Sequence, residues 1–212
     1  MSISTLLRLA EHKALSRVQL SGRVLDLGGD THAEYRAYLK GQHAITSVNM
    51  DPATSPDITH DLETPLPITS GAYDHVLLIN VLEHVYEYRQ LLAEAYRVVR
   101  PGGTVTVVVP FLFPIHPDPH DFWRFSGETL RRECERLGFS DIQIESLGSG
   151  VLAAQYVMFD RLLPSFMRFL NYHTFGRLVP VFDRALVIVA QVLNKKYLPG
   201  DYALGYCVTA RR

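Results

Sequence analysis

The chain has 212 residues, and 47% of them are hydrophobic, which is enough to bury one complete globular core. Its formal net charge is −1, so the molecule as a whole has no field that would attract nucleic acid. Two cysteines, Cys134 and Cys207, are too few and too far apart to indicate a disulfide framework or a zinc site. We therefore expect a single domain, residues 1–212, in a cytoplasmic protein that does not bind nucleic acid.

Residues 1–20 predict an amphipathic N-terminal helix. Its charges are spread along the whole stretch, without the apolar centre and cleavage site of a signal peptide. No run reaches the ~18 uninterrupted apolar residues of a membrane span. The nearest, residues 178–193, is interrupted by Asp183 and Arg184. We expect no membrane-spanning segment.

Short apolar runs alternate with helical patterns from residue 21 to residue 149, which predicts a parallel sheet covered on both faces. The clearest runs are rich in Val, Ile and Leu without polar alternation, as is typical of strands buried on both faces. The strands predicted in the first half of the chain are 23–27, 44–49, 57–60, 74–79 and 104–109. This part of the chain is the expected core.

Two helices are predicted within this core. The first precedes the Pro-Gly-Gly turn at 101–103, which should end it, and its apolar residues have helical spacing: Leu91, Leu92, Ala95, Val98 and Val99. The second begins at the N-cap Ser126, ends at Gly138, and buries Leu130, Cys134 and Leu137. A strand at 139–147 follows it.

The pattern then departs from simple alternation. Residues 150–197 are apolar and helical in pattern, punctuated by Pro164, Gly176 and Pro180, and a last strand at 203–210 lies within the final segment 202–212. We expect a helical insertion or lid, residues 150–197, ahead of the last strand.

In open α/β sheets, ligands bind beyond the carboxyl ends of the strands, so the residues that leave those ends are the candidates for a site. The first strand leaves as "VLDLGGDTHAEY", with Asp26 at its end and Gly28-Gly29 permitting a tight turn. This is not the Gly-x-Gly-x-x-Gly fingerprint, so a dinucleotide-dependent dehydrogenase is poorly supported.

The next three strands leave through polar residues. "SVNMDP" offers Asn49 and Asp51, which could hydrogen-bond a ribose diol. "HDLETPLP" offers Asp61-Leu62, and the fourth strand leaves through Asn80 to Glu83-His84. Each piece alone has a plainer interpretation: a turn, a cap, or an acid near a helix N-terminus beside a half-buried imidazole.

Taken together, these stretches resemble the class I S-adenosylmethionine-dependent methyltransferases, especially the methyltransferase type 11 domain family. The resemblance rests on "VLDLGG", "SVNMD", "HDLETPLP", "AYDHVLLINVLEHV" and "AYRVVRPGGTVTVVVPF", and covers about residues 20–148 and the last strand. It implies a Rossmann-like, doubly wound, seven-stranded, mostly parallel α/β sheet with an antiparallel last strand.

The resemblance also implies S-adenosyl-L-methionine as cofactor and a role for each strand end. Asp26 would organise the loop around the methionine amino group, Asn80 would lie near the methionine moiety, and Asp61-Leu62 would frame the adenine. Gly28 and Gly29 would approach the cofactor, and Asn49 or Asp51 would meet the ribose.

Two departures from the family pattern bear on cofactor binding. Asp30 and His32 replace the later glycines of the first loop, and Asn49 aligns with the usual ribose-binding carboxylate. Both changes predict weaker binding. The alternative function is therefore a catalytically inactive relative that binds S-adenosylmethionine or S-adenosylhomocysteine as a regulatory module.

Residues 110–130 are dense in Pro, His, Asp and aromatic side chains. They resemble the His-x-x-Pro-x-Asp-x-x-Arg-Phe-Thr segment of a methyltransferase subgroup linked to glycan or lipid-linked acceptors, through Asp121, Trp123, Arg124 and Phe125. This implies O-methylation of a small-molecule, glycan or lipid-linked acceptor, whereas the near-neutral charge and the absence of Asn-Pro-Pro-Tyr argue against a nucleic-acid methyltransferase.

Methyl transfer to a hydroxyl group needs alignment and a base. The catalytic candidates are His120, Asp121 and His84, with His116 as a further base candidate. The alternative for Asp121 is an ion pair with Arg124 that locks the loop. A metal site built from Asp118, Asp121 and the two loop histidines is not expected, because a proline-rich loop does not fix ligands as a helix would.

The charge of the chain is unevenly distributed. Residues 151–212 contain eight Lys/Arg and three Asp/Glu, a net of +5 that leaves −6 for residues 1–150. In residues 151–196, seven aromatic residues are interleaved with Arg161, Arg168, Arg177 and Arg184. Two interpretations stay open: helices that cap the acceptor pocket or form a homodimer seam, and a basic, apolar face that contacts the inner face of the membrane.

Overall fold

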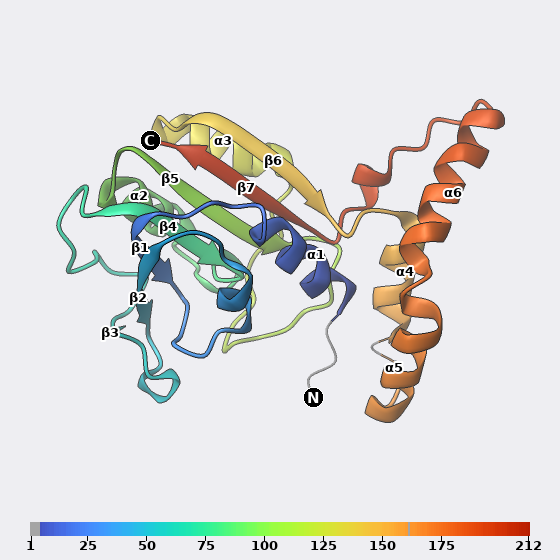
Figure 1. The fold of residues 1–212 in the computed structure, drawn as a ribbon, viewed down its shortest axis with the longest axis horizontal. Coiled ribbons are helices and arrows are strands. Elements are labelled where there is room, and N and C mark those ends of the chain that lie inside the picture. Colours follow the sequence, from blue (N-terminus) through green and yellow to red (C-terminus); the bar gives the residue numbers. More distant parts are fainter. Residues whose placement is uncertain (1–4, 161) are drawn as a thin grey trace.

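The computed structural model of the protein describes residues 5–160 and 162–212 (Figure 1). One seven-stranded sheet has the order β3-β2-β1-β4-β5-β7-β6. The strands are β1 Gly22–Leu27, β2 His43–Asn49, β3 Ile58–Thr59, β4 Tyr73–Ile79, β5 Val99–Pro110, β6 Ser140–Leu147 and β7 Gly205–Arg211. β7 runs antiparallel to β5 and β6, whereas β1 to β5 pair in parallel. The predicted doubly wound α/β sheet with an antiparallel last strand is confirmed.

The α-helices are α1 Leu6–Leu15, α2 Tyr88–Val98, α3 Gly127–Leu137, α4 Val151–Asp160, α5 Ser165–Asn171 and α6 Val179–Val192. Shorter helical turns are η1 Glu34–Tyr38, η2 Pro52–Thr54, η3 Leu82–His84, η4 Tyr172–Gly176 and η5 Pro199–Tyr202. The predicted helix over residues 1–20 is therefore shorter, and its first four residues, like Arg161, lie outside the described part of the chain.

The predicted ends of α3 are confirmed, whereas the predicted end of α2 is wrong. Ser126 Oγ accepts a hydrogen bond from Thr129 N at 3.2 Å, and Gly138 is left-handed with φ 91°. α2 stops at Val98, and the Pro-Gly-Gly turn already belongs to β5. A Cβ on Gly103 would lie 2.6 Å from Asp74 O, so this glycine is needed for strand pairing rather than for ending the helix.

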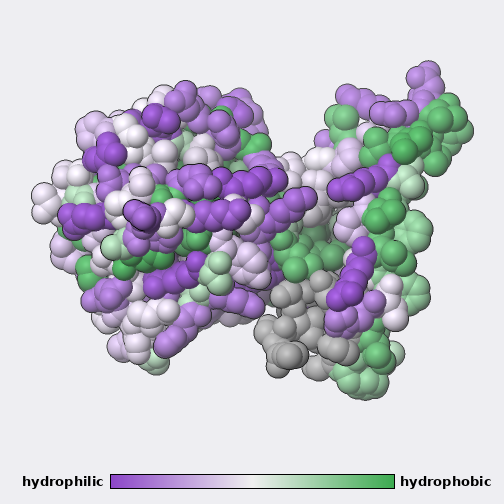
Figure 2. Space-filling model, in the orientation of Figure 1, coloured by the Kyte–Doolittle hydropathy of each residue, from purple (hydrophilic) through white to green (hydrophobic). Residues whose placement is uncertain are grey.

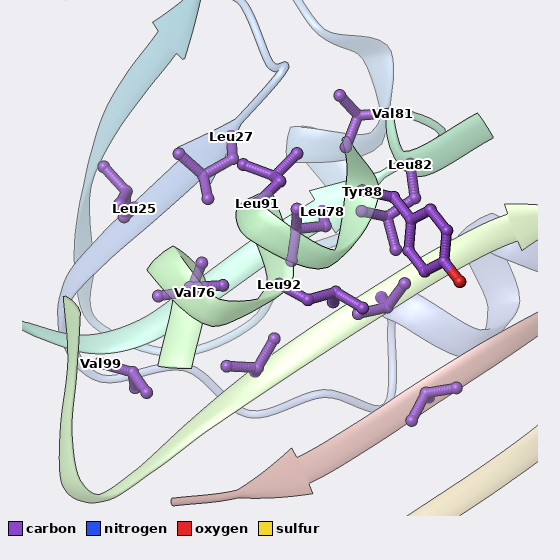
Figure 3. Packing of buried hydrophobic residues seen from close by; sticks show 14 of the residues in the cluster. Leu25, Leu27, Val76, Leu78, Val81, Leu82, Tyr88, Leu91, Leu92 and Val99 are labelled. Carbon is purple, nitrogen blue, oxygen red and sulfur yellow. The ribbon is translucent and has the colours of Figure 1, made fainter. Parts of the chain in front are cut away.

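Successive side chains of a strand point to opposite faces, and the two faces of the sheet bury two clusters. On one face, Leu25 and Leu78 pack with Leu91 of α2, as Figure 3 shows, and the same cluster reaches Leu130 of α3. On the other face, the cluster contains strand residues Val24, Leu77 and Ile79, α1 residues Leu7 and Leu15, and α4 residues Ala153 and Val157. α1 therefore lies against the sheet on the face opposite α2.

The connection from β1 to β2 contains only the short helix η1. Tyr35 of η1 is 7% exposed and belongs to the same cluster as Leu7 and Leu15 of α1. Because no long helix covers this connection, α1 and η1 together enclose the carboxyl ends of β1, β4 and β5.

The helical segment, residues 151–192, projects from one end of the molecule, with α4 and α6 side by side (Figure 1). Asp183 of α6 is 3% exposed and accepts hydrogen bonds from Leu152 N at 2.9 Å and Ala153 N at 2.8 Å, in the first turn of α4. The charge that interrupts the long apolar run thus ties two helices together. In the described part of the chain, each helix is too short or too polar to cross a membrane.

Candidate functional site

A cavity of about 440 Å³ lies at the carboxyl ends of β1, β4 and β5. This is the edge at which open α/β sheets bind ligands. Its wall comes from α1 and its N-cap (Thr5, Leu7, Arg8, Glu11), from the stretch after β1 (Asp30, His32, Ala33, Glu34, Tyr35), from the end of β4 through η3 (Ile79, Asn80, His84) and from the end of β5 and the stretch after it (Pro110, Phe113, His116, Asp118).

Asp26 anchors η1 beneath this cavity. Its carboxylate is fully buried, accepts hydrogen bonds from Tyr35 Oη at 2.8 Å and Arg36 Nη2 at 3.1 Å, and has a pKa that burial raises to about 6. The bonds from Tyr35 and Arg36 oppose that rise. Since Tyr35 also lines the cavity, Asp26 shapes its wall from below.

Gly28 and Gly29 leave no room for a side chain. Gly28 has φ 79°, and a Cβ on it would lie 2.4 Å from Val81 Cγ2. A Cβ on Gly29 would lie 2.2 Å from Asp26 Oδ2. The loop after β1 is therefore packed tightly between its own acid and the exit of β4.

Asn49 connects two loops. Its Nδ2 donates to Gly28 O at 3.0 Å, and its Oδ1 accepts from Asp51 N at 3.0 Å. A carboxylate could not donate to the glycine carbonyl, which gives a physical reason for an amide at this position. Asp51 is exposed, and its Oδ1 accepts from Ala53 N at 2.8 Å at the start of η2.

Asp61 and Leu62 point into different environments. Asp61 is exposed and its Oδ1 accepts from Glu63 N at 2.9 Å, whereas Leu62 is 6% exposed and belongs to the core. These two residues, like Asn49 and Asp51, do not line the cavity. The site residues predicted from the sequence thus fall into a group at β2 and β3 and a group around the cavity.

Asn80 leaves β4 in the left-handed conformation, with φ 52°, while its N–H donates to Val108 O at 2.8 Å. Such a conformation costs about 1–3 kcal/mol for most residues, is tolerated best by Asn, and gathers at functional sites. Here it turns the chain so that Asn80 and His84 both reach the cavity wall.

α1 contributes two charges that the sequence analysis did not assign to the site. Glu11 is 2% exposed, and its Oε2 lies 3.7 Å from Arg8 Nε. Burial raises the pKa of Glu11, and Arg8 and Asn80 oppose that shift. The available signal was the position of Glu11 on the apolar face that also carries Leu7 and Leu15, at a spacing of about four residues.

Glu83 lies between two imidazoles. Its carboxylate is fully buried, and its Oε1 is 3.7 Å from His84 Nε2 and 3.7 Å from His116 Nε2. Neither oxygen has a hydrogen-bond partner in residues 5–160 and 162–212. The pKa of His116 is raised, chiefly by the adjacent Glu83 carboxylate.

Backbone groups of His120 and Phe122 connect the loop after β5 to this cluster. Phe122 N donates to Glu83 O at 2.7 Å, and His84 Nδ1 bonds His120 O. The ring of His120 is exposed and does not line the cavity, so this residue reaches the cluster through its carbonyl group.

Asp121 is engaged in positioning the loop. Its Oδ2 accepts from Arg124 Nη2 at 2.7 Å and from His116 N at 2.8 Å. Arg124 lowers the pKa of Asp121 to about 2, which makes this carboxylate a weak proton acceptor. The predicted alternative, an Asp121–Arg124 ion pair that locks the loop, is confirmed. His84 is the one of the three predicted catalytic residues that lines the cavity.

Comparison with known proteins adds a family match. Residues 25–107 match the family model described as a methyltransferase domain. A protein from Mycolicibacterium smegmatis named "Probable S-adenosylmethionine-dependent methyltransferase" is 37% identical over 54 residues, which are 26% of this chain and 21% of that protein. The match therefore spans about a fifth of the length of the curated relative.

Solved structures have the same fold at low sequence identity. Phosphoethanolamine N-methyltransferase 2 from Haemonchus contortus, in complex with S-adenosyl-L-methionine, has a TM-score of 0.58 at 15% identity, over 96% of this chain and 51% of that one. The cyclase SpnF has a TM-score of 0.59 at 19% identity, over 97% of this chain and 80% of that one.

Proposed function

We propose that the protein is a class I S-adenosylmethionine-dependent methyltransferase that methylates an oxygen atom of a small-molecule, glycan or lipid-linked acceptor. The premise is that residues 25–107 match the methyltransferase-domain family. The observation that carries the proposal is the cavity at the carboxyl ends of β1, β4 and β5, whose wall includes Arg8, Glu11, Asn80 and His84. Such a transfer requires charged groups that bind the cofactor and a group that accepts the proton of the acceptor.

The α1 side of the cavity fits the methionine part of the cofactor. S-adenosylmethionine has an α-carboxylate and an α-ammonium group, and Arg8 and Glu11 offer one charge of each sign on successive turns of α1. Glu11 is buried and Asn80 adds a polar side chain. Asp26, Gly28 and Gly29 would support this end by fixing η1 and the loop after β1.

The nucleoside would lie towards β2 and β3. Asp51, exposed at the end of β2, is the candidate for the ribose hydroxyls, since the donor group of Asn49 already binds Gly28 O. Asn49 would then act through the loop. Asp61 and Leu62 follow β3 and would border the adenine.

The acceptor would enter at the His84 side. When bound, S-adenosylmethionine supplies an electrophilic methyl group on its sulfonium and leaves as S-adenosylhomocysteine. His84 would take the proton of the attacking hydroxyl group on Nε2, because Nδ1 is held by His120 O. Asp121 would act by positioning His116 rather than as the base.

The second candidate is a protein that binds the cofactor without transferring a methyl group. The departures at Asp30, His32 and Asn49 favour it, and SpnF has the same fold with a different named activity. Fold alone does not determine function.

A thermal-shift assay tests whether the protein binds S-adenosyl compounds, as both candidate functions require, or NAD, as a dehydrogenase would. S-adenosylmethionine and S-adenosylhomocysteine are expected to raise the Tm, because both bind only the folded state, whereas NAD leaves it unchanged. Stabilisation by NAD alone would overturn the proposal. Binding of both adenosyl compounds with no turnover on any hydroxyl acceptor would favour the second candidate.

Variants then distinguish the residues that bind the cofactor from the residue that accepts the proton. Glu11→Gln is expected to weaken S-adenosylmethionine binding, and Asp26→Ala to abolish it, because η1 loses its anchor. His84→Ala should lower kcat with little change in cofactor affinity. His120→Ala is the matched control, since its ring is outside the cavity; a large loss of kcat in this variant alone would move the base to His120.

The helical segment supports a lipid-linked acceptor. Large apolar side chains are exposed along it: Met158, Phe159, Leu162, Phe166, Met167, Leu170, Phe175, Leu178, Val181, Phe182, Ile188, Val189 and Val192. Figure 2 shows the part of this apolar surface that lies over α6, interrupted by hydrophilic patches. Arg177, Arg184, Lys195 and Lys196 are exposed nearby. Described residues of this segment do not line the cavity, so the lid interpretation has less support than a surface contact.

We therefore include peripheral contact with an anionic membrane surface in the proposal. Exposed cations contribute about 1 kcal/mol each near such a surface, beside an apolar face that enters the headgroup region. Co-sedimentation with anionic vesicles should exceed that with neutral vesicles and decrease with salt. Equal recovery with both, together with a dimer by light scattering, would favour a homodimer seam instead.

A further inference from the structure

The Glu83–His84–His116 cluster has the composition of a metal site. It offers two imidazole nitrogens and one carboxylate oxygen, and the three ligand atoms lie within 4.8 Å of one another. In a tetrahedral zinc site, with ligand bonds of about 2.0–2.2 Å, neighbouring ligand atoms are roughly 3.4 Å apart. The 3.7 Å that separates Glu83 Oε1 from each Nε2 is close to that spacing.

Both imidazoles have their other nitrogen occupied by a carbonyl oxygen. His84 Nδ1 bonds His120 O, and His116 Nδ1 bonds Pro114 O at 3.0 Å. A carbonyl oxygen only accepts, so each Nδ1 carries a proton, and the neutral form of each ring has its lone pair on Nε2. This is the arrangement by which carbonyl groups fix metal-binding histidines in other metal sites.

The burial of the Glu83 carboxylate is a second observation, independent of the two histidines. Its side chain is 0% exposed, and neither carboxylate oxygen has a hydrogen-bond partner in the described part of the chain. An unpaired buried carboxylate is strongly unfavourable unless a cation or proton neutralises it. The carboxylate is directed at the two lone pairs, where a divalent cation would supply the missing partner.

We propose that Glu83, His84 and His116 bind one divalent transition-metal ion at the wall of the cavity. The donor set, two nitrogens and one oxygen, suits zinc or iron(II), whereas magnesium and calcium prefer oxygen ligands alone. Three protein ligands leave coordination positions open, and His84 and His116 both line the cavity, so those positions face it.

This site gives the ion a role in the proposed reaction. A bound ion lowers the pKa of a hydroxyl group that it coordinates, and His84 would then be a ligand instead of the base. That role rests on the proposed function, whereas binding of the ion does not. The competing possibility is a proton shared between Glu83 and His116 with no ion.

The test uses the full chain, freed of metal with a chelator and then given Zn²⁺, Co²⁺ or Mg²⁺ separately. We expect about one Zn²⁺ or Co²⁺ per chain by elemental analysis, visible Co²⁺ absorption that indicates nitrogen ligation, and a higher Tm with Zn²⁺ but not with Mg²⁺. A folded, metal-free chain that binds neither Zn²⁺ nor Co²⁺ at stoichiometric concentrations would overturn the proposal.

Variants distinguish a loss of Zn²⁺ binding from a loss of folding. Glu83→Gln and His116→Ala should each weaken Zn²⁺ binding by about tenfold or more. Metal-free Glu83→Gln should melt no lower than the metal-free parent, because it removes a buried charge whose oxygens have no hydrogen-bond partner in the described residues. His120→Ala retains the carbonyl group that bonds His84 and should bind Zn²⁺ like the parent. Unchanged Zn²⁺ affinity in Glu83→Gln would exclude this site.

Activity is a separate readout. Zn²⁺ binding without methyl transfer would reject the proposed function and retain the metal site. Methyl transfer that persists after complete metal removal, with no Zn²⁺ binding, would reject the metal site and leave His84 as the base.

Discussion

The apolar side chains of the helices are covered in the sheet domain and exposed in the helical segment. Leu91 of α2 is 0% exposed against the sheet, whereas Ile188 of α6 is 62% exposed. Both are aliphatic residues of regular helices, although α6 has fewer polar residues than α2. The difference teaches that an apolar helical pattern predicts the helix but not the surface that will cover it.

The buried acids of the two regions differ in the same way. Asp26 in the sheet domain accepts hydrogen bonds from two side chains, Tyr35 and Arg36, at the base of a cavity. Asp183 in the helical segment accepts backbone N–H groups of α4 and holds two helices together. One acid lies beneath the candidate site, and the other joins two helices whose outer faces are exposed.

The largest effect is expected from the sheet core. Leu91→Ala should lower the free energy of unfolding by about 2–5 kcal/mol, because it opens a cavity among fully buried side chains. Urea denaturation would measure the change. A loss under about 1 kcal/mol would mean that α2 packs no better than the exposed faces of the helical segment, and would remove the contrast between the two regions.

The second prediction concerns the attachment of α6 to α4. Asp183→Ala should cost about 2–3 kcal/mol locally, since two backbone N–H groups lose a charged acceptor. Hydrogen exchange should rise in α4 and α6 and stay unchanged in β1 and β4. Asp201→Ala, at an exposed acid, is the control, and equal exchange in both variants would contradict the capping role.

A third, smaller effect depends on pH. The pKa of Asp121 is lowered, so its contribution to stability is present above its ordinary pKa and is lost as the pH falls through about 2. Asp121→Asn should therefore destabilise the protein by about 1–2 kcal/mol at neutral pH. Thermal denaturation should show the difference shrinking between pH 4 and pH 2. Asp118→Asn, an exposed neighbour, should show no such trend.

The smallest effect on stability is expected in the helical segment. Ile188→Ala removes a side chain that is 62% exposed, and should change the free energy of unfolding by less than about 0.5 kcal/mol. The same variant should bind anionic vesicles more weakly if this face contacts lipid. Destabilisation comparable to that of Leu91→Ala would mean that the side chain is covered in solution by a second copy.

Much of the sheet domain could be predicted from local sequence. Runs of Val, Ile and Leu predict buried strands, Ser126 predicts the start of α3, and Gly138 predicts its end, because each depends on neighbours a few residues away. The strand ends also indicated Asn80 and His84, since parallel strands bring their carboxyl ends to one edge. The family resemblance supplied the number of strands and the antiparallel direction of the last one.

The tertiary structure decided which of these side chains meet. Glu83 and His84 are adjacent in the sequence, but His116 joins them only because the loop after β5 bonds back to η3. Glu11 reaches the cavity because η1 leaves room for α1 above the sheet. Asn49 looked like a ligand-binding residue, yet its donor serves Gly28 O. Contacts between residues far apart depend on how the packed elements lie, and the periodicity of a single chain carries no signal for that.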